Sequence, residues 1–72
     1  MKLKGEIPDR LTEKQIAILK LLSEGHTIKL VAYKVGISFH TVRQHVHDLE
    51  KRLNANNSAH AVAIALRRGI IE

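Results

Sequence analysis

The segment 39–53 carries the side chains with the greatest capacity for specific recognition in this sequence. Arg43 can donate two parallel hydrogen bonds to O6 and N7 of a guanine, and Gln44 can pair with the edge of an adenine. Two histidines, His40 and His47, can hydrogen-bond to bases or phosphates. Acidic residues are almost absent from this side of the segment. These residue types therefore predict the reading of base-pair edges rather than bond-making chemistry.

The remaining reactive side chains predict neither a catalytic centre nor a metal site. The sequence has no paired-carboxylate site, no nucleophile beside a base and no phosphate-binding glycine loop. It contains no cysteine, which excludes disulfides, zinc–cysteine sites and thiol catalysis. His40 and His47 share a helix face, but neither an acidic residue nor a cysteine joins them. We expect no enzymatic activity, no metal and no cofactor.

Length and charge narrow the choice of partners. A chain of 72 residues forms one small domain with little room for a deep pocket. Its net charge of +5 favours a polyanionic partner, and an aromatic content of only 3% argues against stacking on single strands. No stretch has the length of a transmembrane segment or the apolar run of a signal peptide. We therefore expect a cytoplasmic protein that does not bind membranes.

Apolar periodicity divides the chain into a flexible N-terminal arm at 1–10 and one all-α domain at 11–72. The first helix of the domain follows a capping box, in which Thr12 caps the helix and Gln15 lies three residues later. We place this helix at 13–24, before a glycine that ends it.

The next two helices are predicted to form a helix-turn-helix. Thr27 caps a second helix at 28–35, and the turn Gly36-Ile37-Ser38 leads from it into the helix at 39–53. A helix, a short glycine turn and a further helix are the signature of this motif. Opposite the recognition residues of helix 39–53 lies a narrow apolar stripe. Its members are Val42, Val46, Leu49 and Leu53.

A fourth helix at 59–68 is predicted to begin after Ser58 and is apolar on nearly every side. We expect Val62 and Leu66 to face the core. In so small a domain, apolar residues without a place in the core favour a partner surface. These residues are Ala61, Ile64 and Ala65.

Taken together, these segments resemble the LuxR/GerE-type helix-turn-helix DNA-binding domains over residues 11–71. The pieces are specific for this family as a joint pattern and weak one by one. The matching residues are Leu11-Thr12, 19–25, Val31-Ala32, Ile37-Ser38, Thr41-Val42-Arg43-Gln44-His45, Arg52-Leu53, Asn57, Ala61-Val62 and 65–71. The resemblance implies four helices, with a tri-helical core and a C-terminal dimerisation helix, in a stand-alone, GerE-like small regulator.

In such domains the third helix enters the major groove and the fourth often forms a dimer. The resemblance therefore implies base contacts at His40, Arg43, Gln44 and His47. Phosphate contacts are expected at Thr27, Lys29, Ser38, Thr41, His45 and Lys51, although Thr27 and Ser38 act first as caps and His45 lies beside the core stripe. The dimer interface is expected at Ala61, Ile64, Ala65 and Arg68.

Two positions depart from the family pattern. Leu30 stands where an acid usually follows the lysine of the second helix, and Ser58 stands where an arginine usually begins the fourth. Leu30 bears on an ion pair of the second helix. Ser58 bears on the packing between the third and fourth helices. Many members also carry an upstream receiver or ligand-binding domain, which this sequence does not show.

We therefore expect a dimeric transcription regulator that binds a specific double-stranded DNA site through helix 39–53. The alternative is a protein-interaction module, because the same tri-helical core occurs in region four of bacterial sigma factors, which also contacts polymerase. In that case helix 59–68 would contact RNA polymerase or another regulator.

Overall fold

The structure, a computed structural model, describes residues 10–72 of the chain. The predicted arm at 1–10 lies outside the described residues except for Arg10. The described part consists of four helices, which are α1 (Glu13–Ser23), α2 (Ile28–Val35), α3 (Phe39–Leu53) and α4 (Ser58–Arg67). These residues contain no strand, and the prediction of an all-α fold is confirmed.

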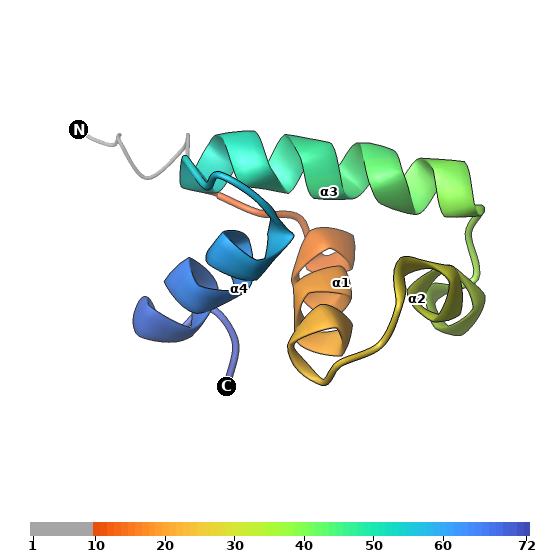
Figure 1. Ribbon diagram of the computed structural model, residues 1–72, viewed down its shortest axis with the longest axis horizontal. Coiled ribbons are helices and arrows are strands. Elements are labelled where there is room, and N and C mark those ends of the chain that lie inside the picture. Colours follow the sequence, from red (N-terminus) through yellow and green to blue (C-terminus); the bar gives the residue numbers. More distant parts are fainter. Residues whose placement is uncertain (1–9) are drawn as a thin grey trace.

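The longest helix, α3, lies across the other three helices, which all pack on one side of it (Figure 1). Beneath it, α1 occupies the middle, α2 lies near its N-terminal half and α4 near its C-terminal half (Figure 1). This arrangement leaves the opposite side of α3 uncovered along its length within the described residues (Figure 1).

Two capping motifs predicted from the sequence are present. The Thr12 Oγ1 accepts a hydrogen bond from the Gln15 backbone N–H at 3.0 Å, and the Gln15 Oε1 accepts one from the Thr12 N–H at 3.1 Å. This capping box fixes the start of α1. In the turn after α2, Gly36 has a φ of 85°, a left-handed conformation that favours glycine. The Ser38 Oγ then accepts the Thr41 N–H at 3.0 Å and begins α3.

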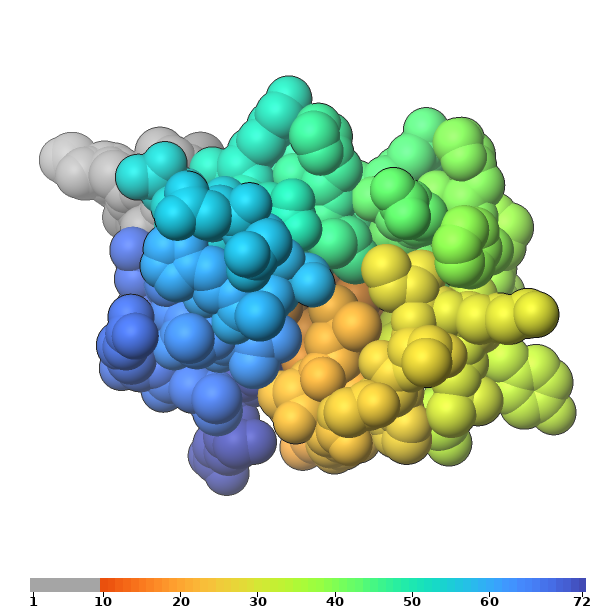
Figure 2. All heavy atoms as spheres, in the orientation of Figure 1, coloured from red at the N-terminus to blue at the C-terminus, as the bar shows by residue number. Residues whose placement is uncertain are grey.

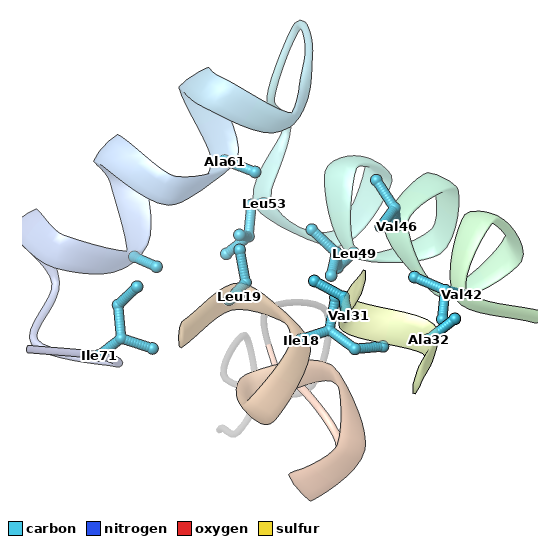
Figure 3. Packing of buried hydrophobic residues seen from close by; sticks show 11 residues of the cluster. Ile18, Leu19, Val31, Ala32, Val42, Val46, Leu49, Leu53, Ala61 and Ile71 are labelled. Atoms are coloured by element: carbon cyan, nitrogen blue, oxygen red, sulfur yellow. The ribbon is translucent and has the colours of Figure 1, made fainter. Parts of the chain in front are cut away.

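The core draws residues from every helix and from the C-terminal segment (Figure 3). Its buried hydrophobic residues are Ile18, Leu19, Val31, Ala32, Val42, Val46, Leu49, Leu53, Ala61, Ala65 and Ile71. The predicted stripe of α3 is therefore entirely buried. None of the helices within residues 10–72 is long and apolar enough to cross a membrane.

The packing of α4 differs from the prediction. Ala61 and Ala65 are completely buried, whereas Leu66 is 46% exposed and Val62 is half-buried. The small methyl side chains let the backbone of α4 approach the core closely, and Ile71 returns after the helix to fill the adjacent space (Figure 3). The expectation that Leu66 would face the core was therefore wrong, whereas the half-buried Val62 packs against the core, as expected.

The start of α4 also differs from the prediction. Asn57, and not Ser58, is the N-cap, because its Oδ1 accepts the His60 N–H at 2.8 Å. His60 Nδ1 in turn accepts the Asn56 N–H at 3.0 Å. The helix consequently begins and ends one residue earlier than the predicted 59–68.

Candidate nucleic-acid interface

Burial of the apolar stripe fixes which face of α3 is presented to solvent. With Val42 and Leu49 fully buried, helical geometry turns the recognition residues outward. His40, Arg43, Gln44, His47 and Lys51 are all exposed. Side chains of α3, coloured green to turquoise, form the upper edge of the molecule in Figure 2. The structure thus brings all four predicted base-reading residues onto the uncovered side of one helix.

A hollow of about 260 Å³ lies beside α3, where the N-terminal ends of α2 and α4 approach it. We call this feature the reading hollow. It is lined by Ile28, Arg43, Val46, His47, Glu50, Asn57 and Ser58. Arg43 and His47, four residues apart on α3, therefore share one concave surface with the first residues of two other helices. His40, Gln44 and Lys51 do not line it.

Three hydroxyl groups predicted to contact phosphate take part in helix caps. The Thr27 Oγ1 accepts the Leu30 N–H at 3.2 Å, which leaves its own hydrogen for an outside acceptor. The Ser38 Oγ donates to the Thr41 Oγ1 at 2.8 Å, so its hydrogen is already used, whereas the Thr41 hydroxyl can still donate. Thr27 and Thr41 are consequently better suited to donate to a phosphate than Ser38.

The other residues predicted to contact phosphate lie on two helices. Lys29 is exposed in the first turn of α2, and Lys51 is exposed on the outer face of α3. His45 is half-buried and acts electrostatically on Asp48. This half-buried position of His45 agrees with the prediction that the residue lies beside the core stripe of α3.

Asp48 joins the N-terminal end of α1 to the middle of α3. Its Oδ2 accepts a hydrogen bond from Gln15 Nε2 at 2.7 Å and another from Arg52 Nε at 2.8 Å. Gln15 is 1% exposed, so this bond satisfies a buried amide. Arg52 also donates from Nη1 to the Arg10 carbonyl at 2.7 Å. The network holds α3 against α1 and against Arg10, which precedes α1.

Electrostatic interactions within this network keep the Asp48 carboxyl of α3 ionised and paired with a cation. The hydrogen bond from Gln15 and the neighbouring Arg52 hold the pKa of the Asp48 carboxyl below its ordinary value, against the opposing effect of burial. Because Arg52 is its ion-pair partner, the charge of Asp48 adds little negative field to the exposed face of α3. Sequence reasoning missed the contact from Gln15, which lies 33 residues away. The spacing of Asp48 and Arg52, four residues apart, was a usable signal for their pairing.

Sequence reasoning also missed the position of Glu50, which lines the reading hollow with Arg43 and His47. Its spacing of seven residues from Arg43 places it on the same helix side, which periodicity alone could have indicated. Within residues 10–72, no group of three or more histidine or acidic side chains lies close enough to hold a metal ion.

The predicted dimer-interface residues on α4 fall into two groups. Ala61 and Ala65 are fully buried within the chain and offer no surface to a second copy. Ile64 is half-buried and Arg68 is exposed. The large apolar side chain that α4 presents to solvent is instead Leu66.

The fold and the exposed face of α3 define a helix-turn-helix domain of the DNA-binding class. Residues 9–65 match the family described as "Bacterial regulatory proteins, luxR family". The chain belongs to this family of DNA-binding transcription regulators, so the resemblance noted in the sequence is confirmed. Proteins of the family act by binding DNA and not as enzymes, in agreement with the expectation from the sequence.

Similar proteins include several bacterial regulators. The transcriptional regulatory protein YdfI of Bacillus subtilis is 36% identical over 62 residues, which cover 86% of this chain and 29% of that protein. The glycerol metabolism activator of Pseudomonas putida is 33% identical over 60 residues, or 83% of this chain and 27% of that protein. The response regulator protein VraR of Staphylococcus aureus is 29% identical over 72 residues, or 100% and 34% respectively. The chain thus spans about a third of the length of these relatives.

Proposed function

We propose that this chain is a sequence-specific, double-stranded DNA-binding domain that regulates transcription as a homodimer, with α3 in the major groove. The observation that carries this proposal is the uncovered face of α3, on which Arg43, Gln44 and two histidines lie opposite a fully buried stripe. Arginine and glutamine in the major groove recognise guanine and adenine through paired hydrogen bonds. Arg43 and Gln44 are the principal base readers in this proposal, and His40 and His47 flank them.

Phosphate contacts would set the position of α3 on the duplex. Lys29 supplies positive charge in the first turn of α2 and Lys51 supplies it on α3 itself, and Thr27 and Thr41 supply hydroxyl donors at helix starts. The first turns of α2 and α3 contain no acidic residue, so their positive helix ends can approach a phosphate without opposing charge. Ser38 and His45 contribute at the edges of this set.

The dimer would form through the solvent-facing side of α4. Leu66 and Val62 lie one turn apart on this side, and both keep apolar surface exposed to solvent. Ile64 and Arg68 remain at its margin, whereas Ala61 and Ala65 act from within the core. A two-fold axis through α4 would give the two copies of α3 a defined separation along the duplex.

The exposed Leu66 also favours one alternative, in which α4 binds RNA polymerase or another regulator instead of a second copy. A pull-down with purified RNA polymerase in the absence of DNA separates the two. If the chain sediments as a monomer and captures RNA polymerase, and if Leu66→Asp abolishes that capture, polymerase would be favoured over a second copy as the partner of α4.

Footprinting with dimethyl sulfate tests the placement of α3, because this reagent methylates guanine N7 in the major groove. A duplex selected from a random pool is treated with and without the protein. We expect protection of guanines in two blocks about one helical turn, or a multiple of it, apart. Binding to the duplex without any protection of guanine N7 would refute major-groove reading.

A further inference from the structure

The outer face of α2 exposes two large hydrophobic side chains to solvent. Tyr33 is 83% exposed and Leu30 is 40% exposed. They lie three residues apart on a helix whose opposite face, with Val31 and Ala32, is buried. In Figure 2 the side chains of α2, coloured yellow to yellow-green, project from the edge of the molecule opposite α4. Apolar surface concentrated on one helix face is a mark of an interaction site.

An open hollow of about 630 Å³ adjoins this face, between α1 and α2. Its lining residues are Ala17, Lys20, Leu21, Glu24, Lys34 and Val35. Leu21 and Val35 are partly buried and pack against the core, so they form a firm apolar floor. None of these residues is among those predicted to contact DNA. The hollow has a volume suited to a few apolar side chains of a partner.

The charges around this hollow are mainly positive. Lys20 and Lys34 are exposed at its edges, and neither forms an ion pair within residues 10–72. Glu24 is its only acid, and it lies 3.6 Å from His26 Nε2. A partner that covers the hollow must therefore combine apolar side chains with carboxylates.

We propose that the outer face of α2 and this hollow, together called the α1–α2 surface, form a docking site for an acidic amphipathic helix of a partner protein. Apolar side chains of such a helix, at a spacing of three and four residues, would contact Tyr33, Leu30 and the floor of the hollow. Its carboxylates would pair with Lys20 and Lys34. The lining of the hollow includes no residue of α3, so the bound partner leaves the recognition residues of α3 open to DNA.

Two other occupants fit the surface less well. A second copy of the chain would bring a surface with two lysines and one acid against the same surface, which leaves an excess of like charge. DNA would satisfy the lysines but would leave Tyr33 and Leu30 without an apolar partner. The lysines and the exposed apolar side chains of the α1–α2 surface together therefore favour an acidic protein segment as its partner.

The test uses a synthetic amphipathic peptide with leucines on one face and glutamates on the other, titrated into the ¹⁵N-labelled full chain. We expect chemical-shift changes at amides of residues 17–35 and dissociation that becomes faster with added salt. A matched peptide with lysines in place of the glutamates is expected not to bind. Shifts confined to α3 or α4, equal binding of the lysine peptide, or no binding would each overturn the proposal.

Variants sharpen this test. Tyr33→Ala and Lys34→Glu should each weaken peptide binding at least about tenfold, a loss typical of a central interface residue. Arg67→Glu, the same change of charge on exposed α4, should leave peptide binding unchanged. Tyr33→Ala should also bind duplex DNA like the wild type, which separates failure of this inference from failure of the proposed function. Displacement of the peptide by duplex DNA would identify the surface as a DNA contact and overturn the proposal.

Discussion

Arg43 is the residue whose position bears most directly on the recognition of a DNA base sequence. It is exposed on α3 and at the same time lines the reading hollow. An arginine held on a helix can present two parallel N–H donors of its guanidinium to O6 and N7 of one guanine. A lysine at this position would carry the same charge but not the paired geometry.

We expect Arg43→Ala to weaken binding to the selected duplex by about 1–3 kcal/mol and to blur the preference at one base position. Fluorescence anisotropy measures the affinity, and competition with single-base variants of the duplex measures the preference. Arg67→Ala removes the same charge from α4 and serves as the control. Equal affinity and preference in wild type and Arg43→Ala would show that Arg43 does not read a base.

Asp48 acts on stability rather than on recognition. Its loss would leave the buried amide of Gln15 without its acceptor, so we expect Asp48→Ala to lower the free energy of unfolding by about 1–3 kcal/mol. Asp48→Asn keeps an acceptor oxygen and should recover part of this loss. Urea denaturation at neutral pH provides the measurement. Equal losses in the two variants would contradict the role assigned to the hydrogen bond from Gln15.

The pH dependence of this contribution follows from the direction of its pKa shift. The folded-state pKa of Asp48 is lowered, so the ionised carboxyl stabilises the fold above the ordinary carboxyl pKa. This stability is lost as the pH falls through the lowered pKa. The difference between wild type and Asp48→Asn should therefore shrink in acid, and a difference independent of pH would exclude the ionised form as its source.

The four helices could be predicted from the sequence because their signals are local. The capping box of α1 and the glycine turn before α3 each lie within a few residues, and the stripe of α3 lies within a single helix. The face of α4 could not be predicted, because a helix that is apolar on every side offers periodicity no contrast. The contact between Gln15 and Asp48 joins two helices and leaves no local signal.

The start of α4 permits a direct check of its observed cap. Asn57→Ala removes the Oδ1 that accepts the His60 N–H and should cost about 1 kcal/mol of stability. Ser58→Ala, one residue later, should have little effect. Thermal unfolding of the two variants measures the contrast. A larger loss from Ser58→Ala would restore Ser58 as the cap.

The exposed side of α4 permits a similar comparison for dimer formation. Leu66→Asp places a charge where the proposal requires apolar contact, so we expect it to shift the chain to monomers in sedimentation experiments. Leu30→Asp makes the same change at a leucine of similar exposure on α2 and should leave the oligomeric state unchanged. An unchanged mass for Leu66→Asp would remove α4 from the interface.

For the whole molecule, the contacts proposed above fall on separate faces of the fold. Helix α3 lies across α1, α2 and α4, so its outer side remains open to a duplex (Figure 1). Helices α4 and α2 lie at opposite ends of the view, with α1 between them (Figure 2). A net charge of +5 favours approach to DNA at any sequence, whereas in the proposed function the face of α3 discriminates between sequences.

Selection of bound duplexes from a random-sequence pool, followed by sequencing, tests the central claim most directly. The account predicts an enriched, two-fold symmetric motif whose half-sites lie about one helical turn, or a multiple of it, apart. Salt-sensitive binding without an enriched motif would contradict it, because such binding is what a basic surface produces without base reading.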